Sequence, residues 1–173
     1  MRILITGGTG LIGRALCPAL VQAGDHVTVL SRRPSRVKAL CGAAVHAMAS
    51  LADYTPDQHF DAVINLAGEP IADKAWTAKQ QQVLRDSRIA LTQSLVAAMQ
   101  AAQHKPRVLL SGSAIGYYGD TGDLSVDESS PAPLQDFSSR LCADWEAAAL
   151  QAQAFGVRVC LLRTGLVLSP TGG

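Results

Sequence analysis

The residues with the clearest chemical meaning are three glycines near the start of the chain. An apolar run at residues 2–6 leads into Gly7, Gly10 and Gly13, which have GxxGxxG spacing, and a helical pattern follows. Glycines at this spacing let the backbone turn tightly, let a pyrophosphate reach main-chain N–H groups, and let the helix pack closely on the strand. We therefore predict a dinucleotide-binding turn, the alternative being a glycine-rich connection without a ligand. Its predicted contacts are Gly7, Thr9, Gly10, Leu11, Ile12 and Gly13.

A second group of polar residues lies about 20 residues beyond the glycines, after the next apolar run. Proteins that prefer NAD usually have Asp or Glu at this point, which accepts a hydrogen bond from the ribose 2′-hydroxyl. This chain has Ser31, Arg32 and Arg33 instead. Because Arg offers a planar fork of donors to phosphate oxygens, these residues predict binding of the 2′-phosphate of NADP(H). The alternative is that both arginines only solvate the end of a strand.

Composition limits the class of protein. The 173 residues are 48% hydrophobic and 17% charged, which predicts one domain with one substantial core. A net charge of +1 argues against nucleic-acid binding. The chain has no leader pattern and no apolar run near the roughly 20 residues that span a bilayer, so we expect a cytoplasmic protein without membrane contact. The four cysteines lack CxxC spacing, which predicts buried thiols and neither disulfides, metal ligands nor a nucleophile.

Apolar runs alternate with helical patterns along the chain. We expect strands at residues 2–6, 26–31, 43–47, 61–66, 107–111 and 157–164, and helices at 11–23, 36–40, 77–103 and 137–155. Crossover helices make the strands parallel. The predicted fold is a doubly wound α/β domain of the Rossmann type over residues 1–173, with strand order 3-2-1-4-5-6. In the first helix, the residues expected to face the sheet are Ile12, Leu16, Leu20, Ala15, Ala19 and Ala23.

Several segments share the pattern of one protein family. They are TGGTGLIG at residues 6–13, NLAGEPI at 65–71, the pair at 87–88, SGSAIGYYG at 111–119, LCADWE at 141–146 and RTGLVL at 163–168. Together they resemble the extended short-chain dehydrogenase/reductase superfamily, and more closely the YfcH-like branch of the NAD-dependent epimerase family. Members of this family continue past the position of Gly173 into a portion that builds the substrate site. The resemblance therefore implies that this chain is the cofactor-binding part of a longer protein.

The resemblance assigns cofactor contacts after the fourth strand. It implies that Leu66, Ala67 and Gly68 line the cofactor, where small residues permit close approach of the backbone. It also implies that Arg88 reaches toward the cofactor phosphates. The residue type alone is equally consistent with a surface cation. Glu69 stays open as a substrate contact, a ribose contact or a plain loop carboxylate.

The resemblance also assigns catalytic residues after the fifth strand. Ser113 stands where the superfamily has a Ser or Thr that hydrogen-bonds a substrate carbonyl or hydroxyl. Tyr117 and Tyr118 follow in a glycine-flanked loop, and either phenol could donate to a substrate oxygen. The plainer alternatives are a turn-forming serine, and tyrosines that pack over the nicotinamide side or close the loop.

One part of the superfamily's chemistry is missing. Its reaction needs a Tyr as general acid/base and a Lys four residues later on the same helix face, and this chain has no Tyr-x-x-x-Lys. The corresponding segment offers Asp136 with Arg140, Phe137 with Leu141, or Ser138 with Cys142. None of these registers supplies a phenol, and Arg cannot release its proton. The sequence therefore predicts cofactor binding without the standard proton donor.

Two functions are compatible with these residues. The first is an NADP(H)-dependent oxidoreductase or epimerase-like enzyme that acts on a small hydroxyl- or carbonyl-bearing substrate. The retained serine and tyrosines favour it. The second is an NADP(H)-binding regulatory or sensor protein without turnover, which the missing Tyr–Lys pair favours.

Overall fold

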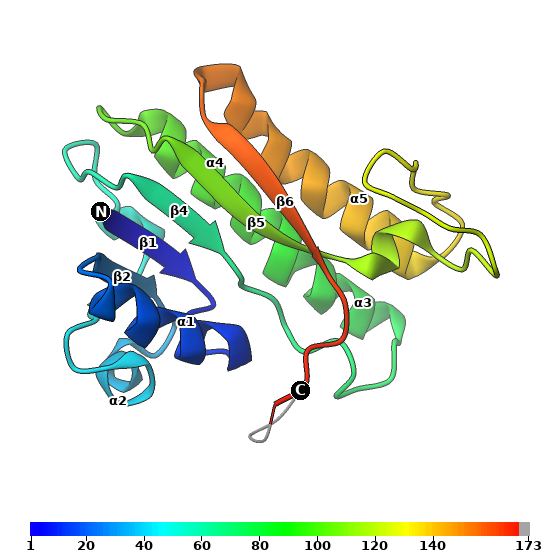
Figure 1. The fold of residues 1–173 in the computed structure, drawn as a ribbon, viewed down its shortest axis with the longest axis horizontal. Helices are drawn as coiled ribbons and strands as arrows, with labels where there is room; N and C mark the ends of the chain where they lie inside the picture. Colours follow the sequence, from blue (N-terminus) through cyan, green and yellow to red (C-terminus); the bar gives the residue numbers. More distant parts are fainter. Residues whose placement is uncertain (170–173) are drawn as a thin grey trace.

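The computed structural model describes residues 1–169, which form a six-stranded parallel sheet with helices on both faces (Figure 1). The order β3-β2-β1-β4-β5-β6 confirms the predicted doubly wound, Rossmann-type fold. The strands are β1 (Arg2–Thr6), β2 (His26–Leu30), β3 (His46–Met48), β4 (Ala62–Asn65), β5 (Val108–Ala114) and β6 (Arg158–Thr164). The α-helices are α1 (Leu11–Gln22), α2 (Val37–Cys41), α3 (Ala78–Arg85), α4 (Leu91–Ala101) and α5 (Phe137–Leu150). The shorter helical segments are η1 (Pro34–Arg36), η2 (Leu51–Asp53), η3 (Asp86–Ala90), η4 (Ile115–Tyr118) and η5 (Gln151–Phe155).

The carboxyl ends of the central strands meet at one edge of the sheet. Thr6 at the end of β1 pairs with Leu30 of β2 and with Asn65 of β4. Asn65 in turn pairs with Ser111 of β5. In open α/β sheets, ligands bind outside the carboxyl ends of the strands where the strand order reverses, which is between β1 and β4 in this sheet. The loop after β1 and the long segment after β4 both leave from this edge (Figure 1).

Alternation of side chains along the strands builds a core on each face of the sheet. Leu4 of β1 and Val63 of β4 lie in the core that α4 and α5 cover. Ile3 and Ile64, one position away on the same strands, lie in the core beneath α1 and α2. The central strand β4 is buried along its whole length, whereas the outer strand β6 is half-buried. The two cores hold the central strands, and thus the edge described above, in a fixed position.

The face of α1 that packs on the sheet differs from the expected one. Cys17 is fully buried, and Leu16 and Leu20 pack beside it. The residues that are exposed instead are Ile12, Ala15, Ala19 and Ala23, so the prediction that they face the sheet is wrong. A Cβ placed on Gly13 would lie 2.4 Å from the carbonyl oxygen of Gly8. This close approach fixes the rotation of the helix about its axis. The face of α1 that packs on the sheet is therefore the one with Gly13 and Cys17, which are four residues apart.

Several element boundaries also differ from the expected ones. β5 continues to Ala114, three residues past its predicted end, so Ser113 lies inside the strand. The strand predicted at 43–47 is β3, at 46–48. The helix predicted at 77–103 is interrupted by η3, a π-helical turn, and the helix predicted at 137–155 ends in the 3₁₀ segment η5.

The cysteines are all free, as predicted. Cys17, Cys41 and Cys142 are buried and Cys160 is half-buried. Burial raises the pKa of Cys17 to about 12, so its thiol stays protonated near neutral pH. Within residues 1–169, no group of three or more His, Cys, Asp or Glu side chains is placed to hold a metal ion. No helix in that range is long and apolar enough to cross a membrane.

Candidate functional site

The glycines between β1 and α1 are needed for different reasons. Gly7 has φ of +69°, and a Cβ there would lie 2.5 Å from the main-chain carbonyl carbon of Leu66. A Cβ on Gly13 would clash with Gly8, as described above. The fold itself therefore requires both of these glycines. Gly10 is different, because a Cβ there would approach only the carbonyl oxygen of Gly7, at 3.1 Å. The missing side chain of Gly10 thus leaves open space above the turn.

This open space lies at the N-terminus of α1. The helix begins at Leu11, directly after Gly10, with no side-chain cap and no acidic residue in its first turn. Its first N–H groups and the helix dipole favour an anion at this point. Arg14 adds a positive charge, and its Nε donates to the carbonyl oxygen of Thr9 at 2.7 Å. The predicted contacts Thr9, Leu11 and Ile12 are therefore all part of a positively polarised turn.

Basic side chains at the end of β2 lie next to this turn. Because Thr6 pairs with Leu30, Ser31 leaves its strand beside the start of the glycine turn. The hydroxyl of Ser31 accepts a hydrogen bond from the main-chain N–H of Arg33 at 3.1 Å. Arg32 and Arg33 are both exposed, and neither takes part in an ion pair within residues 1–169. Both guanidinium groups are thus available to an anion.

The segment after β4 closes against the glycine turn. The N–H of Leu66 donates to the carbonyl oxygen of Thr6 at 3.1 Å, and the N–H of Ala67 donates to the Thr6 hydroxyl at 3.3 Å. Gly68 lies against Arg88, because a Cβ on Gly68 would be 2.9 Å from the guanidinium carbon. The structure therefore brings these predicted cofactor contacts, including Arg88 from a distant helix, to one edge of the sheet.

Arg88 lies in η3, and π-helical turns inside α-helices are frequent at functional sites. Its guanidinium donates to the carbonyl oxygen of Glu69 at 3.0 Å and lies 5.4 Å from the centre of the Trp145 ring. Burial lowers the pKa of Arg88. None of the ion pairs within residues 1–169 includes Arg88. It is a partly buried cation that a bound anion would neutralise.

A buried hydrogen-bond network fixes the strand ends behind this edge. The amide oxygen of Asn65 accepts from the Thr6 hydroxyl at 2.6 Å, and its nitrogen donates to Thr92 at 2.8 Å and to Ser111 at 3.3 Å. The Thr92 hydroxyl also accepts from the indole N–H of Trp145 at 3.0 Å. These bonds join β1, β4, β5, α4 and α5. Sequence reasoning missed the network, although Asn65 begins the NLAGEPI motif and Trp145 lies in the LCADWE motif.

Ser113 is directed into the protein. It is 3% exposed, and its hydroxyl donates to a carboxylate oxygen of Glu146 at 2.6 Å. Glu146 is 5% exposed and forms a two-point ion pair with Arg163, with N···O distances of 2.8 and 2.9 Å. The hydrogen bond to Glu146 holds the pKa of Arg163 above its usual value. Sequence reasoning missed this pair because its members are 17 residues apart on different elements, a separation without a recognisable spacing.

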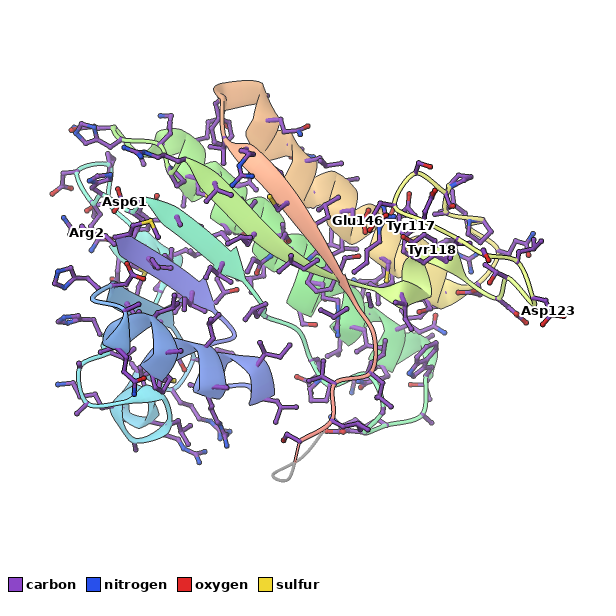
Figure 2. All side chains as sticks on the ribbon, in the orientation of Figure 1. Arg2, Asp61, Tyr117, Tyr118, Asp123 and Glu146 are labelled. Carbon is purple, nitrogen blue, oxygen red and sulfur yellow. The ribbon has the colours of Figure 1, made fainter. Side chains whose placement is uncertain are left out.

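Arg163 also contacts both of the tyrosines predicted to be catalytic. It donates to the hydroxyl of Tyr118 at 2.9 Å, and its guanidinium carbon lies 3.6 Å from the centre of the Tyr117 ring. Figure 2 shows Tyr117 and Tyr118 close to Glu146, which lies in the second half of α5. The structure therefore brings Ser113, Tyr117 and Tyr118 around one buried ion pair.

The first turn of α5 contains the residues that the family resemblance matches to the superfamily's Tyr and Lys. Asp136 caps the helix by accepting from the main-chain N–H three residues later, at 2.8 Å. Phe137 packs edge-on against Trp76, with ring centres 5.4 Å apart. Arg140 donates to the main-chain carbonyl oxygen of Leu134 at 3.0 Å. Each of these side chains has a structural contact, and none is a phenol.

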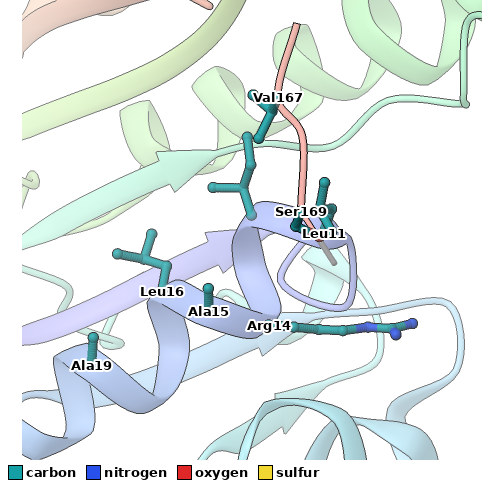
Figure 3. Close-up of a pocket in the computed structure, with 8 residues that line it drawn as sticks. Leu11, Arg14, Ala15, Leu16, Ala19, Val167 and Ser169 are labelled. Carbon is teal, nitrogen blue, oxygen red and sulfur yellow. The ribbon is translucent and has the colours of Figure 1, made fainter. Parts of the chain in front are cut away.

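A separate hollow of about 710 Å³ lies beside α1. Its walls come from the exposed side of α1, between Leu11 and Ala19, and from Val167 after β6 (Figure 3). Most of these side chains are apolar. The hollow adjoins the glycine turn at Leu11 and Ile12, and its polar lining residues are Arg14 and Ser169.

The fold and the glycine turn define a nucleotide-binding domain of the Rossmann type. The sequence pattern of the NAD dependent epimerase/dehydratase family matches residues 3–173. The chain belongs to this family, which confirms the resemblance seen in its motifs.

Curated relatives are longer than this chain. The chain is 42% identical to the epimerase family protein Mb2239 of Mycobacterium bovis over 175 residues, covering 99% of this chain and 55% of the relative. It is 37% identical to the epimerase family protein SSP1921 of Staphylococcus saprophyticus, covering 98% of this chain and 56% of the relative. The chain thus spans about half the length of the relatives it matches.

Solved structures of similar fold hold nicotinamide cofactors. The human epimerase family protein SDR39U1 (isoform 2), solved with NADPH, has a TM-score of 0.85 and 33% identity, and the match covers 100% of this chain and 56% of that protein. The UDP-glucuronic acid 4-epimerase of Bacillus cereus, solved with NAD, has a TM-score of 0.78 and 23% identity, and the match covers 98% of this chain and 58% of that protein. At 23% identity the second likeness concerns the fold alone.

Proposed function

We propose that this chain is the NADP(H)-binding domain of an oxidoreductase or epimerase-like enzyme that acts on a small hydroxyl- or carbonyl-bearing substrate. The open space above Gly10, at an uncapped helix N-terminus, carries the proposal. A side chain there would meet little of the protein, so the glycine serves a bound group more than the fold. A dinucleotide diphosphate fits this place in charge and position. The NADPH in the SDR39U1 structure supports the choice of cofactor.

The neighbouring residues fit the other parts of the same cofactor. Leu11 and Ile12 offer main-chain N–H groups to the diphosphate, and Arg88 offers a charge that forms no ion pair within residues 1–169. Arg32 and Arg33 suit a 2′-phosphate, so we propose a preference for NADP(H) over NAD(H). The proposed cofactor contacts are Gly7, Thr9, Gly10, Leu11, Ile12, Gly13, Ser31, Arg32, Arg33, Leu66, Ala67, Gly68 and Arg88.

The proposed catalytic group is the cluster around Arg163. A bound nicotinamide supplies or accepts a hydride, and the protein must supply the proton. Tyr118 is the best proton donor in the cluster, because its oxygen accepts from Arg163 and its own O–H is left to donate. It lines a hollow of about 340 Å³. Ser113 commits its proton to Glu146, so we propose that it positions the group, and that Tyr117 does so by stacking on Arg163.

A second candidate function is an NADP(H)-binding regulatory or sensor protein without turnover. The start of α5 favours it, because Phe137 and Arg140 are held in structural contacts where the superfamily has its acid/base pair. The two functions share the cofactor site and differ only in turnover. A panel of carbonyl substrates with NADPH, offered to the longer parent protein, distinguishes them.

Calorimetric titration with NADPH and with NADH tests the proposal. NADPH should bind about tenfold or more tightly than NADH, because each charge-assisted contact to the 2′-phosphate is worth roughly 1.5–3 kcal/mol. Arg32→Ala should erase most of this difference. Arg158→Ala, which removes an equally exposed charge at the opposite end of the sheet, should leave both affinities unchanged. Equal affinities of the unaltered chain for the two cofactors would overturn the NADP(H) assignment.

A further inference from the structure

Positive charge is concentrated in the first third of the chain. Residues 1–52 contain six Lys or Arg and one Asp, whereas the other residues contain nine Lys or Arg and thirteen Asp or Glu. The first segment includes the glycine turn, α1, the end of β2 and α2. Arg2 begins β1 at the opposite edge of the sheet, and the other five basic residues lie in the segment from α1 to α2. This local excess of positive charge points to an anionic ligand with more than one charged group.

Arg14 is the one basic residue of α1, and it is held in place by the glycine turn. Its Nε donates to the carbonyl oxygen of Thr9 at 2.7 Å. The side chain is otherwise exposed, and Arg14 takes part in no ion pair within residues 1–169. The hydrogen bond through Nε fixes the plane of the guanidinium, while the terminal nitrogens keep their donors for a ligand.

Arg14 has a neighbour in α2. Figure 3 shows its side chain extending away from the apolar residues Ala15, Leu16 and Ala19 of the hollow. Burial raises the pKa of Cys41 in α2, and the nearby charge of Arg14 offsets part of this rise. The thiol of Cys41 in turn donates to the carbonyl oxygen of Gly8 at 3.2 Å. Arg14 is therefore close to Cys41, the residue of α2 that contacts the glycine turn.

The end of β2 lies against the same part of the turn. A Cβ on Gly8 would be 2.6 Å from the side chain of Val29. Ser31, Arg32 and Arg33 begin two residues after Val29 on that strand. Arg14 and the pair Arg32 and Arg33 thus belong to two separate segments of the chain that both lie against the glycine turn.

We propose that Arg14 determines cofactor specificity by binding the 2′-phosphate of NADP(H) together with Arg32 and Arg33. This inference rests on the proposed function, in which that phosphate lies at the end of β2. The diphosphate instead meets the N–H groups of Leu11 and Ile12, whereas the Nε of Arg14 is engaged by the Thr9 carbonyl oxygen, so we assign the terminal nitrogens of Arg14 to a different anion. A phosphate dianion can accept from several guanidinium forks at once, whereas a ribose hydroxyl cannot.

The test is calorimetric titration of the unaltered chain and of Arg14→Gln with NADPH, NADH and 2′,5′-ADP. The Gln side chain keeps a donor that can reach the Thr9 carbonyl and removes the charge, and a thermal melt checks that the fold is retained. We expect Arg14→Gln to weaken NADPH and 2′,5′-ADP about tenfold and to change NADH less than about twofold. Arg14→Ala should also weaken binding of NADPH and 2′,5′-ADP and have little effect on NADH. Arg158→Ala should leave the affinities for all three ligands unchanged.

Two outcomes would overturn the proposed role of Arg14 and leave the proposed function standing. In the first, Arg14→Gln leaves NADPH affinity unchanged while Arg32→Ala still lowers it. In the second, Arg14→Gln weakens NADH as much as NADPH, which would place Arg14 on a part common to both cofactors. If the unaltered chain binds NADPH and NADH equally, the proposed NADP(H) preference fails first, and this inference fails with it.

Discussion

Replacing Gly10 with Val should abolish cofactor binding and leave the fold intact. Gly10 has φ of −79° and ψ of −179°, an extended conformation that Val adopts without strain. The new Cβ would be 3.1 Å from the carbonyl oxygen of Gly7, which a shift of a few tenths of an ångström relieves. The two methyl groups of Val would then occupy the space in front of the first N–H groups of α1.

The size of the expected effect follows from the hydrogen bonds that are lost. A hydrogen bond to a charged group is worth about 1.5–3 kcal/mol. Loss of two N–H contacts to a diphosphate therefore weakens binding by roughly 100-fold or more. The small adjustment near Gly7 should cost about 1 kcal/mol or less, a fall in Tm of roughly 2–4 °C at most.

Gly13→Ala is the matched control for this experiment. Its Cβ would lie 2.4 Å from the carbonyl oxygen of Gly8, a main-chain contact that cannot relax locally. We expect a loss of about 1–3 kcal/mol of stability and a Tm lower by roughly 2–12 °C. Calorimetric titration with NADPH and a circular-dichroism melt measure both effects. If Gly10→Val keeps its affinity with an unchanged melt, the turn is an ordinary βα connection and the reasoning is refuted.

Three further predictions concern catalysis and stability. This chain alone should not consume NADPH steadily with any of a panel of carbonyl compounds; steady consumption that Ser113→Ala abolishes would show a complete active site. Glu146→Gln should cost about 3 kcal/mol, a fall in Tm of roughly 6–12 °C, because it removes the buried carboxylate that pairs with the half-buried Arg163. Asp144→Asn, at the exposed pair with Arg85, should cost less than about 1 kcal/mol, and equal losses would contradict the role of burial. Because burial raises the pKa of Cys17 to about 12, its contribution to stability is complete below the unfolded pKa of about 8.5 and is lost as the pH rises toward 12. In the unaltered chain the urea midpoint of unfolding should fall as the pH rises above about 9, and in Cys17→Ala this fall should be smaller. An equal fall in both proteins would contradict the prediction.

The strand order could be predicted because each central strand is a short apolar run followed by a turn or helix signal. The end of β5 could not be predicted in this way. Gly112, Ser113 and Ala114 have weak strand preferences, and they are held in the sheet by pairing with residues 162–164 of β6. A long-range pairing therefore moved Ser113 from the expected loop into the strand, with its hydroxyl directed at Glu146.

The glycine turn could be predicted because its requirements are local. A tight turn, a close helix contact and an open helix N-terminus all fall within a few residues of sequence. The Glu146–Arg163 pair depends on α5 lying against β6, which no local spacing indicates. The position of Arg88 beside Gly68 was implied only by the family resemblance. The prediction for α1 chose the wrong face of the helix. Its alanines are spaced by four residues, as Gly13 and Cys17 are, and glycine does not count as a hydrophobic residue in the pattern.

Titration of the isotope-labelled chain with NADPH, followed by the resonances of its main-chain amides, tests the central claim most directly. If NADPH binds as proposed, the amides of Leu11 and Ile12 and those of residues 66–68 should shift at one common affinity. The amides of residues 31–33 should shift strongly with NADPH and weakly with NADH, because only NADPH carries the 2′-phosphate. Shifts confined to other parts of the chain, or no shifts at millimolar NADPH, would contradict the assignment of this edge as a dinucleotide site.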